Sequence, residues 1–226
     1  MKYTVEDFYS KKFEDESNEI LLNERWLFSE KAMEDYVIQI TNISLSDYIS
    51  YCESLSPSPN YTSKDITQLS SLYDCTLGMC KALKEVDHGL SYTEIATKLH
   101  DGQYYKYNSG ALTKYGENQV KTASQLGLTI CIKDLWYLSS IGQIFPNLAD
   151  DIQNKYFSIC LLRDPFYSRV LCSMCKQETN LPNYMTILSE TTQKRRLSSC
   201  KQLINFFIQQ CNTESINIYP ITTNFN

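Results

Sequence analysis

Apolar residues recur every three to four positions along most of the chain, and this spacing predicts a mainly helical protein. The first helical stretch covers residues 5–55, and the run Ser56–Asn60, which contains two prolines and no large apolar side chain, ends it. Further helices are expected at residues 66–86, 92–99, 112–126, 149–162, 164–176 and 189–209.

Three local signals sharpen these boundaries. Ser91 and Glu94 stand at capping-box spacing before the helix 92–99. Gly127 is placed like a helix stop, because glycine adopts the left-handed conformation with which many helices end. Asp164 followed by Pro165 is typical of a helix start, where proline loses no hydrogen bond.

Short alternating segments predict small β-structure. Residues 128–132 and 135–138 are rich in β-branched and aromatic residues, so Lys133-Asp134 is expected to be a two-residue hairpin loop without the usual glycine. Residues 216–221 alternate and predict a final strand. Three helices followed by a hairpin is the element order of a winged helix-turn-helix.

The helix-and-strand order recurs after residue 148. The predicted fold is therefore mainly α with small β-hairpin wings: tandem winged helix-turn-helix units at 66–148 and 149–226, preceded by a helical segment at 1–60. An all-helical bundle with incidental strands is the alternative.

Charge divides the chain at the proline-containing run. Residues 1–60 hold 5 Lys/Arg and 12 Asp/Glu, a net charge of −7, whereas residues 61–226 are net +2 and residues 163–201 are net +4. This asymmetry favours different partners for the two parts. We expect residues 1–60 to be a separable docking element for a protein partner; the alternative is a merely solvated helical surface.

Composition excludes several classes. No apolar run approaches the roughly 20 residues of a membrane helix, so no membrane association is expected. The first 30 residues lack a secretory pattern, so a cytoplasmic location is expected.

The nine cysteines are an odd number, which disfavours a disulfide framework and indicates reduced, mostly buried thiols. Only Cys172 and Cys175 have metal-like spacing, and whether they bind a metal stays open; no cofactor is expected.

Common catalytic motifs are missing. A restriction-type nuclease centre is usually written (D/E)-x-K, and no lysine of this chain has Asp or Glu two positions before it. Neither a phosphate-binding G-x-x-x-x-G-K-[ST] loop nor a G-x-S-x-G nucleophile motif occurs. The sequence therefore favours a non-catalytic protein.

Two helices carry polar faces suited to DNA. Asn and Gln side chains can pair with adenine, while Lys and Arg reach guanine or phosphate. The candidate DNA-binding residues are Lys114, Asn118, Lys121, Thr122 and Gln125 on the first helix, and Lys194, Arg195, Ser198 and Lys201 on the second. A solvated helix surface is the alternative for the first set, and Arg196 is expected either at this surface or paired with a carboxylate inside the fold.

The sequence around these helices resembles a known arrangement. Residues 114–128, KYGENQVKTASQLGL, resemble a recognition helix ending in A-x-x-L-G-L, and Trp136–Phe145 resembles its wing strand, with Ser139 where Thr is usual. Residues 189–201, SETTQKRRLSSCK, are similar to the S-x-T-x-x-R-R helix that follows in the same modules. Such tandem units resemble the DNA-recognition part of type IIS restriction and nicking endonucleases and related bacterial defence proteins.

This resemblance implies sequence-specific binding of double-stranded DNA by a non-catalytic specificity or accessory component of a restriction or defence system. Three alternatives stay open: a transcription regulator, a winged-helix scaffold that binds only protein, and a nuclease with a non-standard metal site. The last would use carboxylates of the N-terminal segment, namely Glu14, Glu16, Glu19, Glu24 and Glu30.

Overall fold

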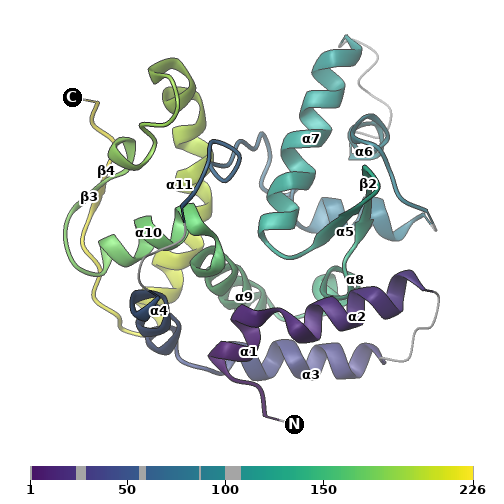
Figure 1. The fold of residues 1–226 in the computed structure, drawn as a ribbon, viewed down its shortest axis with the longest axis horizontal. Coiled ribbons are helices and arrows are strands. Elements are labelled where there is room, and N and C mark those ends of the chain that lie inside the picture. The colour runs from purple at the N-terminus through teal and green to yellow at the C-terminus, as the bar shows by residue number, and fades with distance from the viewer. Residues whose placement is uncertain (1, 24–28, 56–59, 87, 100–107, 226) are drawn as a thin grey trace. The chain divides into compact units, whose positions relative to one another are not determined.

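The computed structural model describes residues 2–23, 29–55, 60–86, 88–99 and 108–225 (Figure 1). Within these ranges the chain is mainly helical, as predicted, with eleven α-helices, one two-stranded antiparallel sheet and one two-stranded parallel pair. None of the described helices combines the length and the apolar character that crossing a bilayer requires.

The chain forms two compact units, and each is built from separated segments. The first unit contains residues 1–10, 37–68 and 149–226, and the second contains residues 11–36 and 69–148. This division differs from the predicted segments 1–60, 66–148 and 149–226.

The N-terminal helices explain the difference. They are α1 (Val5–Ser10), α2 (Lys12–Leu22), α3 (Glu30–Thr41) and α4 (Leu45–Ser54). In the first unit, Phe8 of α1 is fully buried and its carbonyl accepts a hydrogen bond from Arg163. In the second unit, the ring of Phe13 stacks on that of Tyr36 at 4.2 Å between centroids. The hydrophobic residues of segment 1–60 are therefore shared between both cores.

The second unit contains the predicted helix–helix–hairpin succession. Its remaining elements are α5 (Leu77–Lys84), α6 (Tyr92–Leu99), α7 (Ser109–Gln125), β1 (Thr129–Ile132), β2 (Leu135–Leu138), α8 (Ser140–Ile144) and the 3-10 turn η2 (Phe145–Asn147). β1 and β2 pair antiparallel, with Ile132 opposite Leu135. Lys133 and Asp134 both have positive φ, 49° and 64°, which confirms the predicted two-residue turn.

Local capping agrees with the sequence signals. Glu94 accepts a 2.8 Å hydrogen bond from the Ser91 N–H, so the capping box is formed. α7 ends in a Schellman arrangement: Gly127 has φ of 75°, its N–H donates to Ser124, and the Leu128 N–H donates to Ala123. Both predicted boundaries are confirmed.

The predicted helix 66–86 is wrong in its first half, since α5 begins only at Leu77. The preceding segment is held instead by side chains of α7. Gln119 accepts from the Ser70 N–H and donates to the Ser71 carbonyl, and Tyr115 donates to Asp74. Buried Gln119 binds backbone groups that a continuous helix would have used internally.

The first unit is organised around α9 (Asp150–Arg163). Its other C-terminal elements are α10 (Pro165–Met174), β3 (Thr179–Asn180), the 3-10 turn η3 (Leu181–Tyr184), α11 (Glu190–Thr213) and β4 (Ile221–Thr222). Residues 155–162 are all buried, which is typical of a central helix covered on several sides. The Asp164 side chain accepts from the Phe166 and Tyr167 N–H groups, confirming the predicted start of α10.

A partly buried ion pair connects α9 with the end of α11 and the start of α4. Lys155 of α9 pairs with Glu214, which also accepts a 2.7 Å hydrogen bond from the Leu45 N–H at the start of α4. Burial alone would raise the pKa of Glu214, but the hydrogen bonds from Lys155 and Leu45 outweigh burial and hold this pKa below its ordinary value.

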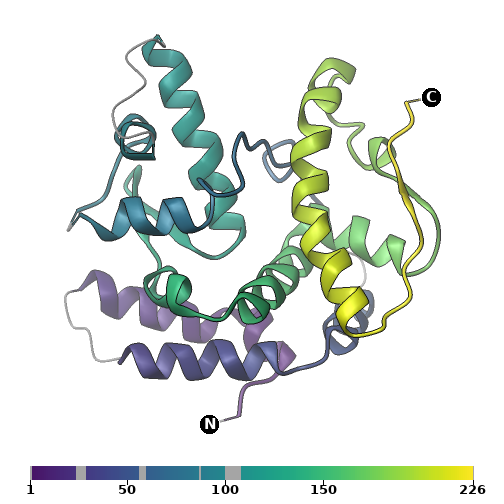
Figure 2. The same cartoon turned by 180° about the vertical axis from the view of Figure 1, so that it is seen from behind.

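The expected second wing differs from the prediction. β3 precedes α11 and β4 follows it, and the two pair in parallel with only two residues each. Figure 2 shows the C-terminal chain, in yellow, running beside the long helix α11. Among the described residues that follow α11, no antiparallel hairpin forms, and the strand predicted at 216–221 is limited to Ile221–Thr222. Two residues per strand support far less pairing than β1 and β2 have.

Candidate functional sites

The polar face of α7 is partly exposed, as the helical spacing predicts. Lys114 and Lys121 are exposed, whereas Asn118 and Gln125 are half-buried. These four positions are separated by three or four residues, so they line one side of the helix.

Thr122 does not belong to this side, so the prediction that it lies on the exposed polar face is wrong. Its side chain is only 1% exposed, and its hydroxyl donates a 3.0 Å hydrogen bond to the Asn118 carbonyl. Thr122 lies one helical turn before Leu126, and both therefore face the core.

Glu117 interrupts the positive charge of α7. Its carboxylate lies 2.8 Å from the Lys114 ammonium and 2.6 Å from that of Lys121. Burial acts to raise the pKa of Glu117, but the hydrogen bonds from the two lysines outweigh it and lower the pKa. The exposed face of α7 thus combines two amide side chains with two lysines that share one carboxylate.

The basic face of α11 is more open. Lys194, Arg195, Ser198 and Lys201 are all exposed. Lys194 pairs with Glu190 at 2.5 Å and lies over the ring of Phe225. Within the described part of the chain, neither Arg195 nor Lys201 forms an ion pair, so both cations face solvent.

Arg196 is half-buried and directed toward the fold. It donates 2.6 Å hydrogen bonds to the carbonyls of Ser63 and Ile66, which anchors the segment that precedes the second unit. The α7 set lies in the second unit and the α11 set in the first, so each forms its own surface.

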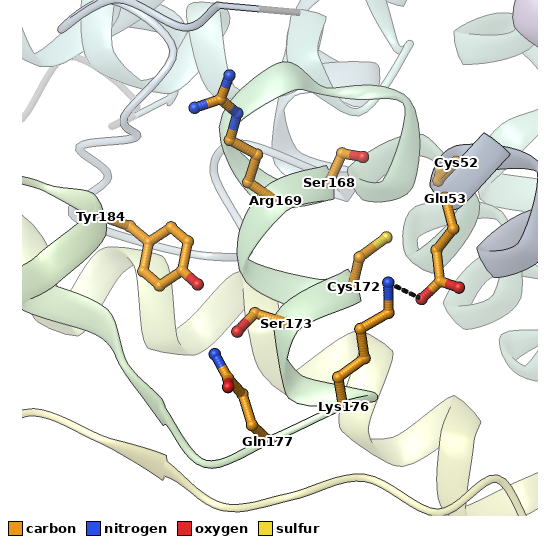
Figure 3. A pocket seen from close by; sticks show the side chains of 9 residues that line it. All are labelled: Cys52, Glu53, Ser168, Arg169, Cys172, Ser173, Lys176, Gln177 and Tyr184. Carbon is orange, nitrogen blue, oxygen red and sulfur yellow. Dashed lines mark ion pairs between the residues drawn. The ribbon is translucent and has the colours of Figure 1, made fainter. Parts of the chain in front are cut away.

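The first unit also contains a cavity of about 540 Å³ that the sequence did not signal. It is lined by side chains of α4, α10 and the segment after α10 (Figure 3). Arg169 lies against the Tyr61 ring, and Lys176 forms a 3.1 Å ion pair with Glu53. Cys52 and Cys172 lie on the wall formed by α4 and α10.

Cys172 and Cys175 have different surroundings. Cys172 lines the cavity together with Cys52, whereas burial raises the pKa of Cys175 to about 11. In the described ranges, no group of three or more His, Cys, Asp or Glu side chains is arranged to hold a metal ion.

The N-terminal carboxylates considered for a metal centre do not form one in the described residues. Glu14 is buried and accepts a 3.2 Å hydrogen bond from the Tyr36 hydroxyl. Glu24 lies outside the described residues.

Comparison of the chain with family models, with curated proteins and with solved structures found no match.

Proposed function

We propose that this protein binds double-stranded DNA in a sequence-specific manner, with α7 as the recognition helix of a winged helix-turn-helix. The observation that carries the proposal is the succession α5, α6, α7, β1 and β2, in which Leu90 forms an antiparallel bridge to Trp136. A short strand before the second helix, paired with the hairpin after the third, is the arrangement of a winged helix. Its third helix enters the major groove.

The residue types on α7 support base reading. Asn118 and Gln125 lie on its partly exposed face and can form paired hydrogen bonds with adenine. Lys114 and Lys121 are exposed beside them and serve phosphate or guanine contacts. Lys133 in the hairpin turn is exposed as well and adds a cation at the wing tip.

The basic face of α11 supplies a second contact surface in this proposal. Arg195 and Lys201 have no ion pair in the described ranges, so binding phosphate breaks no existing pair. Ser198 lies between them and can donate a hydrogen bond to a phosphate oxygen, and Lys194 lies at the same end. We further propose, from the motif resemblance alone, a specificity or accessory role in a bacterial restriction or defence system.

A winged-helix scaffold that binds protein is the second candidate. The pairing of Glu117 with both Lys114 and Lys121 favours it, because a carboxylate at the centre of the recognition face repels phosphate. The net charge of −5 acts in the same direction.

Binding-site selection with the full chain, followed by titration at two salt concentrations, separates the candidates. We expect Asn118→Ala or Gln125→Ala to reduce the free energy of DNA binding by about 1–3 kcal/mol and to relax the preference at one base position only. We expect Arg195→Ala/Lys201→Ala to weaken binding to all sequences and to reduce the salt slope by about two units. Lys12→Ala, which removes an exposed cation of α2, is the control and should change neither quantity. If selection enriches no sequence and binding shows no salt dependence, the scaffold is favoured.

A further inference from the structure

Two cysteines that are 120 positions apart meet at the wall of the cavity in the first unit. Cys52 lies near the end of α4 and Cys172 near the end of α10, and both residues line the same cavity. Figure 3 shows the Cys172 side chain directed toward α4, which carries Cys52 and Glu53.

The surroundings of Cys52 include two further polar groups. The Tyr9 hydroxyl contacts its sulfur atom, and the Leu162 carbonyl lies 3.2 Å from that atom. Although Cys52 is only 5% exposed, it lines the 540 Å³ cavity, through which a small molecule can reach it.

Three other cysteines differ from Cys52 in the pKa of their thiols. Burial raises the pKa of Cys75, Cys80 and Cys200 to about 12, which keeps them protonated and unreactive. Hydrogen bonding by Cys172 opposes the effect of burial at Cys52 and, with help from Tyr9, lowers its pKa to about 7. The same hydrogen bond, together with burial, raises the pKa of Cys172. The thiolate therefore forms more readily at Cys52 than at Cys172.

We propose that Cys52 and Cys172 form a dithiol that hydrogen peroxide, or a small organic hydroperoxide, oxidises to a disulfide joining α4 to α10. The proposal rests on the cavity that both residues line, on the packing of α4 against α10, and on the direction of the Cys172 side chain toward α4. It is independent of DNA binding.

The chemistry is a two-electron oxidation. The Cys52 thiolate attacks one peroxide oxygen, the O–O bond breaks, and Cys52 becomes a sulfenic acid while hydroxide leaves. Hydroxide takes the proton of Cys172 and becomes water. The Cys172 thiolate then attacks the Cys52 sulfur, the S–S bond forms, the S–O bond breaks, and the second hydroxide takes a proton from solvent. One hydrogen peroxide is thereby reduced to two waters, and an organic hydroperoxide would give one alcohol and one water.

Cys175 is the competing partner for Cys172, because the two are three residues apart at the end of α10. Its side chain does not line the cavity, and it shares no hydrogen bond with Cys52 among the described contacts. The structure therefore favours the long-range pair over the C-x-x-C pair.

The test uses the full chain, reduced, freed of reductant and treated with one equivalent of hydrogen peroxide. Remaining thiols are alkylated, and the protein is digested with trypsin without reduction and analysed by mass spectrometry. Trypsin places Cys52 alone in peptide 32–64, and both Cys172 and Cys175 in peptide 170–176. We expect these peptides to be cross-linked, with Cys175 alkylated.

Two cysteine variants and the exposed Cys131 serve as controls. Cys172→Ala should abolish the cross-link and Cys175→Ala should retain it, with circular dichroism of the reduced proteins as the folding control. Exposed Cys131, in peptide 122–133, reports non-specific oxidation. A disulfide within peptide 170–176 would overturn the proposal. Oxidation of Cys131 while peptide 32–64 stays reduced would also overturn it, and both results can be read from the wild-type protein without any variant.

Discussion

Helices α7 and α11 both carry residues expected at a DNA surface, but they hold their cations differently. On α7, one carboxylate binds two exposed lysines, and the half-buried amides of Asn118 and Gln125 lie on the same face. On α11, Arg195 and Lys201 face solvent without an ion pair among the described residues. Free cations suit sequence-independent phosphate contacts, whereas amides suit base reading. Under the proposed function, α7 contributes specificity and α11 contributes affinity.

The largest effect is expected from deleting residues 1–60, because the deletion removes parts of both cores at once. The first unit would lose buried Phe8, and the second unit would lose Phe13 and the contact between Ser17 and Ser140, whose hydroxyls are 2.8 Å apart. We expect an unfolded or insoluble protein, measured by circular dichroism and thermal unfolding. A folded, soluble truncation would support the docking element expected from the sequence.

The next largest loss of stability is expected from a substitution in the second unit. α6 and α7 approach closely at Gly116, where an added Cβ would lie 1.9 Å from the Tyr92 carbonyl oxygen. We expect Gly116→Ala to cost about 3 kcal/mol or more, since backbone atoms must move apart. Gly110→Ala is the matched control on the same helix, because its nearest neighbour lies at 3.6 Å. Denaturant unfolding should show the control at or slightly above wild-type stability; equal losses in both variants would mean that α6 and α7 are not closely packed.

In the first unit, the corresponding test is Glu214→Gln, which leaves Lys155 without its charge partner. We expect a loss of about 2–3 kcal/mol at pH 7. Because the folded-state pKa of Glu214 is lowered, its contribution is present above its unfolded-state pKa of about 4.3 and is lost as pH falls below it. The difference between variant and wild type should therefore shrink in acid.

Glu190→Gln serves as the control for this pH dependence. It removes an exposed carboxylate that pairs with Lys194, and we expect little change in unfolding at any pH. If Glu190→Gln and Glu214→Gln have equal effects across the pH range, the buried pair does not stabilise the first unit.

The smallest expected effect is a change in DNA affinity, and it tests the difference between α7 and α11. Glu117→Gln releases Lys114 and Lys121 and should make α7 resemble α11, with DNA affinity raised by about 0.5–1 kcal/mol at low salt. Stability should fall by no more than about 0.5 kcal/mol. Glu34→Gln in α3 changes the net charge equally and should leave affinity unchanged. Equal gains in both variants would attribute the effect to net charge alone.

Features that depend on neighbouring residues could be predicted from the sequence. Ser91 with Glu94, Asp164 with Pro165, and Gly127 act within one helical turn, and each predicted boundary is found in the structure. The turn at Lys133-Asp134 is equally local, since the length of the loop between two alternating segments selects its geometry.

The other features depend on contacts between residues that are distant in the chain, so the sequence pattern did not predict them. Thr122 is buried since its turn of α7 faces the core, and residues 66–76 are not helical since Gln119 binds their backbone. Parallel pairing of β3 with β4 requires the whole of α11 to fold between them. Cys52 and Cys172 line the same cavity because α4 packs against α10. The amphipathic pattern of each helix shows which of its faces is buried, but it does not show which other helix covers that face.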